Sequence, residues 1–248
     1  MKKIHLSVVA SAYNESENIS RGCLNEVWNY LQGQKYSWEI VIVNDGSSDN
    51  TSELLHKFAA GKKEVRIIDN THQGKASGIL TVGLAAVGEI VLFIDIDQAT
   101  PISELDKLLK KLNSGFDIAI GSRPGRKGAP LFRQILAYGN VVLRTLILHL
   151  PFRDTQCGFK ALKSEAAQKI FTLMRKLRPI VAVDGPAVDP GFDVELLYLG
   201  RKFGYKISEV TVDWHHQETR RVRFFYDMIS GIQGLFQVRF RAMANKYV

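Results

Sequence analysis

Two aspartates stand one residue apart at the end of an apolar run. The run Ile90–Ile94 is followed directly by Asp95-Ile96-Asp97. Where a strand ends the chain turns, so both carboxylates could reach one ion. Carboxylate oxygens suit Mg²⁺ or Mn²⁺, which commonly complete their coordination with water and substrate phosphates. Asp-x-Asp also occurs by chance in loops, but its place after an apolar run favours a metal site.

Three further polar residues could take part in the same chemistry. Asp45 precedes Gly46-Ser47, so it could close an Asx-turn or cap a helix, or accept hydrogen bonds from a nucleobase imide or a ribose hydroxyl. Glu15 has the same two interpretations, and Lys75 could face nucleotide phosphates or solvent. The chain has neither Gly-x-x-x-x-Gly-Lys-Ser/Thr nor Gly-x-Gly-x-x-Gly. The ATPase and dehydrogenase classes therefore lose their main support.

The elements that would position these side chains alternate along the first half of the chain. We expect strands at Leu6–Ala10, Glu39–Val43, Val65–Ile68, Ile90–Ile94 and Asp117–Ile120. We expect helices at Ser16–Leu31, from Asn50 onward, at Lys75–Val87 and at Ile102–Asn113. This order predicts an α/β fold, a Rossmann-like and mostly parallel sheet with helices on both faces. Ligands of such sheets bind beyond the carboxyl ends of the strands, where the polar residues stand.

The second half is less regular, and no linker separates it from the first. We expect a mobile loop at Arg123–Arg133, a turn-rich loop at Val183–Pro190, a strand at Ile207–Asp213 and an amphipathic helix at Phe224–Arg241. Gln134–Leu150 is mostly apolar, which predicts a buried or half-buried helix, with an interfacial membrane helix as the alternative. The chain is therefore expected to form a single domain over residues 1–248.

Composition narrows the class of protein. The 248 residues include 33 Lys and Arg against 25 Asp and Glu, a net charge of +8, and residues 201–248 carry nine basic and four acidic residues. Such a surface suits nucleic acid, anionic lipid or phosphorylated substrates, but no nucleic-acid module with interleaved aromatics is present. Two cysteines exclude a disulfide framework and a Cys-based zinc site. The longest stretch without Asp, Glu, Lys or Arg has 13 residues, too few for a transmembrane helix.

Several motifs in order resemble those of inverting family 2 glycosyltransferases, whose fold is called GT-A. The shared motifs are Ala12–Glu15, Val43–Thr51, Gly74-Lys75 and Asp95-Ile96-Asp97. Further motifs are similar to those of dolichyl-phosphate glucosyltransferases and, less closely, of dolichyl-phosphate mannose synthases: Ala99–Pro101, Gly121–Arg123, Arg153–Lys160 and Phe192–Leu197. Ala99 stands where mannose synthases tend to carry Gln, so UDP-glucose is the first donor and GDP-mannose the alternative. A non-catalytic protein that binds sugar nucleotides is the alternative from another class.

The resemblance implies roles for individual residues. Residues 1–122 would bind the nucleotide sugar and residues 123–248 the acceptor. The residues implied for the nucleotide sugar are Ala12, Tyr13, Glu15, Asp45, Lys75 and Asp95. Asp95 and Asp97 would bind the divalent cation, Mg²⁺ or Mn²⁺, and Asp97 and Arg123 would act in catalysis. The residues implied for phosphate groups of the acceptor are Arg123, Arg133 and Arg221.

The reaction implied by the resemblance moves a hexose to a polyprenyl or dolichyl phosphate. The acceptor phosphate, with a second pKa of about 6, is already largely dianionic at neutral pH, so no general base is expected. Asp193 and Glu195 are conceivable bases, but a structural role is favoured for both. A lipid acceptor also implies a peripheral enzyme on the cytoplasmic face of a membrane, which it would meet through Gln134–Leu150 and the basic C-terminal helix.

Overall fold

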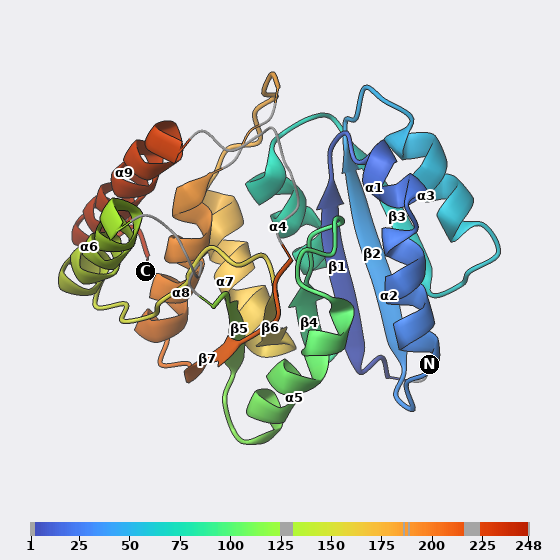
Figure 1. Ribbon diagram of the computed structural model, residues 1–248, viewed down its shortest axis with the longest axis horizontal. Coiled ribbons are helices and arrows are strands. Elements are labelled where there is room, and N and C mark those ends of the chain that lie inside the picture. Colours follow the sequence, from blue (N-terminus) through green and yellow to red (C-terminus); the bar gives the residue numbers. More distant parts are fainter. Residues whose placement is uncertain (1–2, 125–130, 186, 188, 216–223, 248) are drawn as a thin grey trace.

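The computed structural model describes residues 3–124, 131–185, 187, 189–215 and 224–247, without the side chains of 131–137, 190 and 224–230. Its centre is a seven-stranded sheet (Figure 1) in the order β3-β2-β1-β4-β6-β5-β7. The strands are β1 (Leu6–Ala12), β2 (Trp38–Asp45), β3 (Val65–Asn70), β4 (Ile90–Phe93), β5 (Ile118–Ser122), β6 (Lys160–Lys163) and β7 (Ile207–Thr211). All neighbours are parallel except β6, which is antiparallel to both β4 and β5. The predicted mostly parallel sheet is confirmed.

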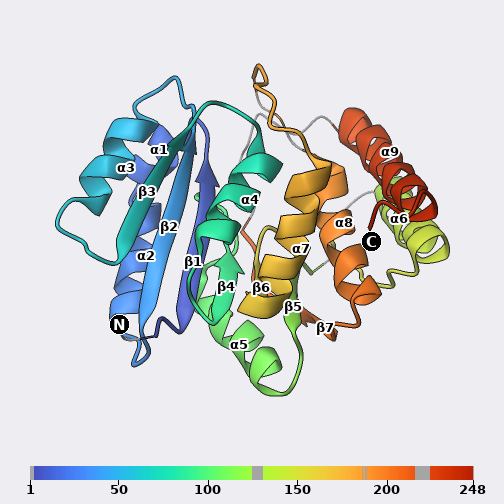
Figure 2. The ribbon, with the colours of Figure 1, turned by 180° about the vertical axis from the view of Figure 1, so that it is seen from behind.

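Helices cover both faces of the sheet (Figures 1 and 2). The helices are α1 (Ser16–Ser20), α2 (Cys23–Gln32), α3 (Thr51–Ala59), α4 (Lys75–Ala85), η1 (Ile102–Glu104), α5 (Leu105–Asn113), α6 (Leu131–Leu148), α7 (Ser164–Leu177), α8 (Pro190–Lys202) and α9 (Phe224–Met243). One apolar core forms beneath α1, α2, α3 and α5, and a second beneath α4, α7, α8 and α9. Neighbours such as Val8 and Val9 enter opposite cores, because successive side chains of a strand point to opposite faces.

The structure corrects two expectations about individual elements. The single helix predicted at 16–31 is two helices, because Gly22 adopts a φ of 92° at their junction, a conformation in which glycine is favoured. The loop predicted at 123–133 ends sooner, since α6 begins at Leu131. The mobility expected of this loop stays a prediction, because residues 125–130 lie outside the described part of the chain. The sequence pattern does not predict β6, α7 or α8. The strand at 207–213 and the helix at 224–241 are confirmed as β7 and α9.

Candidate active site

The carboxyl ends of four parallel strands meet at one edge of the sheet. In the strand register Ala12 pairs with Asn44 and Asp45 pairs with Asn70, while β4 ends at Phe93. The chain leaves each strand there and enters a polar turn. The residues predicted for the nucleotide and the metal therefore lie along a common edge.

The acidic pair lies directly after β4, opposite the first residue of α4. Lys75 donates to Asp95 with its Nζ atom 2.5 Å from Oδ1, and the Asp97 carboxylate accepts the Ala99 backbone N–H at 3.0 Å. The charge of Asp95 raises the pKa of the Lys75 ammonium well above its ordinary value. Burial alone would raise the pKa of the Asp95 carboxyl, but the charge and hydrogen bond of Lys75 outweigh burial and lower it. Burial and then the charge of Asp95 raise the pKa of Asp97.

The antiparallel strand β6 adds residues that sequence reasoning had not singled out. Because β6 runs against its neighbours, its beginning lies beside the end of β4. Lys160, with a nearly buried ammonium, donates to the Asp193 carboxylate at 2.6 Å and to the Cys157 carbonyl. Its charge also lowers the pKa of Asp95. Gly158 backs Asp95 so closely that a Cβ atom on it would lie 2.1 Å from Asp95 Oδ2.

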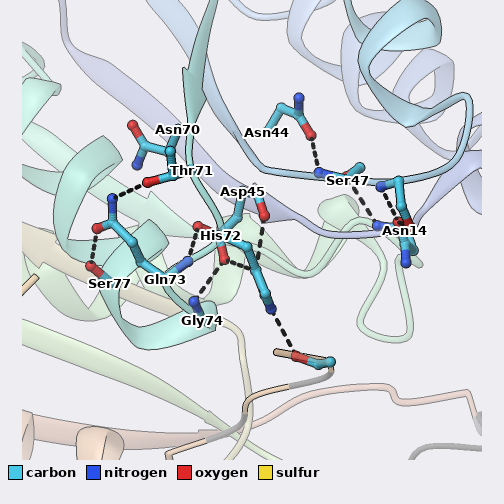
Figure 3. A network of polar contacts seen from close by, with 12 residues as sticks. Asn14, Asn44, Asp45, Ser47, Asn70, Thr71, His72, Gln73, Gly74 and Ser77 are labelled. Carbon is cyan, nitrogen blue, oxygen red and sulfur yellow. Dashed lines mark hydrogen bonds and ion pairs between the residues drawn. The ribbon is translucent and has the colours of Figure 1, made fainter. Parts of the chain in front are cut away.

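Asp45 is fully buried and organises the turn before α4 (Figure 3). Its carboxylate accepts the backbone N–H groups of Gln73 at 3.0 Å and Gly74 at 2.8 Å, and the ring Nδ1 of His72 lies 2.8 Å from Oδ2. The His72 ring also stacks on Tyr13, with centroids 3.8 Å apart and planes 8° apart. The Asx-turn expected of Asp45 is made instead by Asn44, whose Oδ1 accepts the Ser47 backbone N–H at 3.2 Å. Asp45 organises the distant turn at residues 72–74, where its partner His72 stacks on Tyr13.

Glu15 and Ala12 belong to the turn after β1. The Glu15 backbone N–H donates to Thr51 Oγ1 at 2.7 Å, and its carboxylate accepts a hydrogen bond from Asn18. Ala12 is fully buried at the end of β1. The neighbouring Asn14 accepts the Ser48 backbone N–H at 2.9 Å. Its own backbone N–H donates to Ser47 Oγ at 3.1 Å (Figure 3), so this turn is tied to the one after β2.

Arg123 lies at the end of β5 and is held by an acid. Its Nε and Nη2 atoms lie 2.6 and 2.9 Å from the two oxygens of Asp154, the two-pronged geometry that guanidinium groups form with carboxylates. The guanidinium carbon lies 5.6 Å from the centroid of the Trp214 ring. The charge of Arg123 lowers the pKa of Asp95, so Arg123 contributes to the electrostatics of the acidic pair.

Of the remaining predicted residues, the structure describes the side chain of Glu195 but not those of Arg133 and Arg221. Arg221 lies outside the described residues; Arg133 lies in α6, but its side chain is outside them too. Glu195 is fully buried and accepts hydrogen bonds from Arg178, Arg241 and the Tyr247 hydroxyl. Glu195 therefore joins α7, α8, α9 and the C-terminal segment, which agrees with the structural role favoured for it.

The acidic pair fits a divalent cation by the chemistry of its donors. Asp95 and Asp97 offer partly exposed carboxylates, and the side-chain amide oxygen of Gln98 is buried without a hydrogen-bond donor from the described residues. Within the described ranges no three His, Cys, Asp or Glu side chains are grouped as a metal site. A cation held by Asp95 and Asp97 could take further ligands from substrate phosphates and water, as Mg²⁺ and Mn²⁺ commonly do.

Comparison with known proteins identifies relatives of this arrangement. The model of the family described as "Glycosyl transferase family 2" matches residues 7–171. Over 234 residues the chain is 34% identical to dolichyl-phosphate beta-glucosyltransferase ALG5A of Trichomonas vaginalis, covering 89% of this chain and 68% of that protein. Over 261 residues it is 30% identical to the human dolichyl-phosphate beta-glucosyltransferase, covering 98% of this chain and 77% of the human protein.

A solved structure of similar fold contains both a metal and a nucleotide. It is glucosyl-3-phosphoglycerate synthase of Mycobacterium tuberculosis in complex with Mn²⁺, UDP and glucosyl-3-phosphoglycerate. The TM-score is 0.64 at 17% identity, covering 96% of this chain and 80% of that one. At this identity the likeness shows the shared GT-A fold alone.

Proposed function

This chain belongs to glycosyl transferase family 2, and we propose that it transfers glucose from UDP-glucose to a polyprenyl phosphate with inversion at the anomeric carbon. The chain is accordingly an enzyme, a glycosyltransferase of the GT-A fold. The observation that carries the choice of substrates is the 34% and 30% identity to proteins named dolichyl-phosphate beta-glucosyltransferase. Glucose thereby takes precedence over the mannose alternative.

We assign the nucleotide sugar to residues 1–122 and the acceptor to residues 123–248. Tyr13 and Asp45 form what we call the nucleobase subsite, because an aromatic face and a carboxylate are suited to stack on a base and to accept its N–H. Ala12 and Glu15 would complete the walls of this half at the turn after β1. Support comes from the strand register, which brings the ends of β1 and β2 together.

Asp95, Asp97 and Lys75 would receive the diphosphate. A divalent cation, when bound, supplies stabilisation of the negative charge that develops on the leaving nucleoside diphosphate. Asp95 and Asp97 would hold that cation with their carboxylates. Lys75, which bonds to Asp95 in the structure, would place a fixed positive charge beside the same phosphates. Lys160 and Arg123 add further positive charge, since both lower the pKa of Asp95.

The acceptor needs orientation more than deprotonation. A phosphate monoester with a second pKa of about 6 is already largely ionised at neutral pH, so its oxygen can attack without a general base. The two conceivable bases have other contacts, since Asp193 pairs with Lys160 and Glu195 is buried among two arginines and a tyrosine. Arg123, positioned by Asp154, would orient the acceptor phosphate, and we retain Arg133 and Arg221 as proposed phosphate ligands.

A lipid acceptor requires contact with a bilayer, and two packed helices offer a surface for it. Helices α6 and α9 lie side by side in both views (Figures 1 and 2) and contact each other. Each exposes large apolar side chains at helical spacing, a set that we call the apolar face: Tyr138, Val142, Leu146, Phe236, Phe240 and Met243. Among the described residues no helix is long and apolar enough to cross a membrane. We therefore propose peripheral attachment through the apolar face, on the cytoplasmic side.

Transfer of labelled glucose tests the proposal. The protein is incubated with UDP-[¹⁴C]glucose, polyprenyl phosphate and Mn²⁺, and the label extracted with the lipid is measured. We expect a glucose lipid whose anomeric configuration is β, because inversion converts the α-linked donor. Parallel incubation with GDP-mannose should give at most a small fraction of that transfer. Label absent from the lipid with UDP-glucose would contradict the proposed substrates.

A further inference from the structure

The ring of His72 contacts three separate segments of the chain at once. It lies flat against Tyr13 after β1, with centroids 3.8 Å apart. Its Nδ1 atom lies 2.8 Å from Oδ2 and 2.9 Å from the carbonyl oxygen of Asp45 at the end of β2 (Figure 3). Its Nε2 atom lies 2.7 Å from the carbonyl oxygen of Gly185, which belongs to the connection before α8. The ring therefore joins the nucleobase subsite to the second half of the chain.

Both ring nitrogens of His72 face only acceptors in these contacts. A carboxylate and backbone carbonyls have no hydrogen to give, so these contacts stabilise the imidazolium form, in which Nδ1 and Nε2 each carry a hydrogen. Burial alone would lower the pKa of His72, but the Gly185 carbonyl and the Asp45 carboxylate outweigh burial and raise it. Asp184, one residue before Gly185 in the sequence, is exposed, and Lys75, three residues after His72, pairs with Asp95.

We propose that the His72 imidazolium is the resident occupant of the nucleobase subsite and that the base of the donor displaces it. The inference rests on the proposed function, which assigns Tyr13 and Asp45 to the base. Uracil is also a flat ring that could stack on Tyr13, and its imide N–H could point at the Asp45 carboxylate as the Nδ1–H of the imidazolium does. A ring that bonds to Asp45 must stack on the face of Tyr13 that His72 covers. The imidazolium and the base therefore cannot occupy the subsite at the same time.

Displacement of His72 also acts on the connection before α8. Besides the ring contact to Gly185, the Val183 backbone N–H donates to the His72 carbonyl at 3.1 Å, and the Lys75 backbone N–H donates to the Ala187 carbonyl at 3.2 Å. We call residues 183–185 and 187 the strap. When the ring leaves, Gly185 loses its donor and the strap keeps its two backbone bonds. Entry of the base thus loosens the middle of the strap.

The competition predicts how donor affinity changes with pH. The His72 pKa is raised on folding, so the imidazolium is fully formed below its ordinary pKa of about 6.5 and is lost as the pH rises through the raised value. The apparent dissociation constant equals the intrinsic one divided by the fraction of molecules whose subsite is open. UDP should therefore bind the wild-type protein more tightly as the pH rises.

Calorimetric titration of the full chain with UDP in the presence of Mn²⁺ tests this inference at pH 6.5, 7.5 and 8.5. His72→Ala should bind UDP about tenfold more tightly than wild type at pH 6.5, and the difference should shrink towards pH 8.5. His5→Ala is the matched control, because His5 pairs with Glu89 at 2.9 Å near the opposite end of β1. The same ligand is used throughout, so ionisation of UDP cancels in the ratio of affinities.

Equal or weaker UDP binding by His72→Ala at pH 6.5 would overturn the inference. If that variant fails to fold in a thermal melt, His72→Gln, which cannot carry the charge, replaces it. A ratio of variant to wild-type affinity that does not shrink between pH 6.5 and 8.5 also overturns the inference. Absence of UDP binding to the wild type contradicts both this inference and the proposed function. UDP binding without glucose transfer contradicts the proposed function only, and the ratio of affinities still decides the role of His72.

Discussion

A methyl group placed behind Asp95 should disable the acidic pair without altering any charge. A Cβ atom on Gly158 would lie 2.1 Å from Asp95 Oδ2 and 2.6 Å from its Cγ. An ordinary contact needs about 3.4 Å, so in Gly158→Ala the carboxylate and the backbone of residue 158 must move apart by more than 1 Å. Misplacement of a catalytic group by about 1 Å can cost about 100-fold in rate. We therefore expect kcat/KM to fall about 100-fold, equivalent to about 2.7 kcal/mol.

The assay is transfer of glucose from UDP-glucose to polyprenyl phosphate over a range of Mn²⁺ concentrations. Displacement of Asp95 should raise the Mn²⁺ concentration needed for half-maximal activity as well as lower the rate. Gly139→Ala, in α6, is the matched control, because a Cβ atom there meets nothing within 4 Å. This control should keep its activity and gain up to about 1 kcal/mol of helix stability. Activity of Gly158→Ala within threefold of wild type, with unchanged Mn²⁺ dependence, would refute the placement of Asp95 at the metal.

Four further predictions concern other parts of the molecule. Asp97→Ala should lower glucose transfer at least 1,000-fold, because the loss of a metal ligand removes several kcal/mol of charge stabilisation; near-normal transfer would contradict the metal assignment. Glu195→Ala should lower the free energy of unfolding in urea by about 3–5 kcal/mol, because it leaves Arg178 and Arg241 without their buried partner; exposed Glu53→Ala is the control. Phe240→Glu should weaken sedimentation with anionic vesicles, whereas Val87→Glu, equally exposed at 63% against 65% but distant from α9, should not. Burial would raise the pKa of Asp154, but Arg123 holds it below its ordinary value. The free energy of unfolding of wild type should therefore exceed that of Asp154→Asn by a constant amount above about pH 4, and this difference should vanish as the pH falls further. A difference that does not decline at all as the pH falls below about 4 would show that the ion pair is not its source.

The parallel part of the fold was predictable because its signals are local. Runs such as Glu39–Val43, with four apolar residues in succession, are typical of strands covered on both faces. The first four of the predicted strands are each followed by a helix-like pattern. The break between α1 and α2 was not predicted, because periodicity alone does not reveal that Gly22 adopts a positive φ. Strand β6 has four residues, Lys160–Lys163, two of them charged, and is too short and too polar to be separated from a loop by its pattern.

The site shows the same division between local and long-range information. The sequence predicts the positions of four site residues at the carboxyl ends of the strands, because each of them ends or follows a recognisable strand or opens a helix: Asp95, Asp97, Asp45 and Lys75. The family motifs add their order along the chain. The contact between Tyr13 and His72 could not, because it joins residues 59 positions apart whose packing no periodicity encodes. Whether the residues predicted for catalysis and acceptor binding act as proposed stays a prediction until the substitutions above are measured.

The direction of β6 explains why the site draws on both halves of the chain. A parallel strand between β4 and β5 would have put its first residues at the opposite edge of the sheet, away from Asp95. Because β6 is antiparallel, with Lys160 opposite Phe93, the segment leading into it arrives at the carboxyl ends of β4 and β5. That segment supplies Gly158 behind Asp95 and Asp154 beneath Arg123. One reversed strand thus joins the proposed donor half to the proposed acceptor half at the carboxylates where the sugar would be transferred.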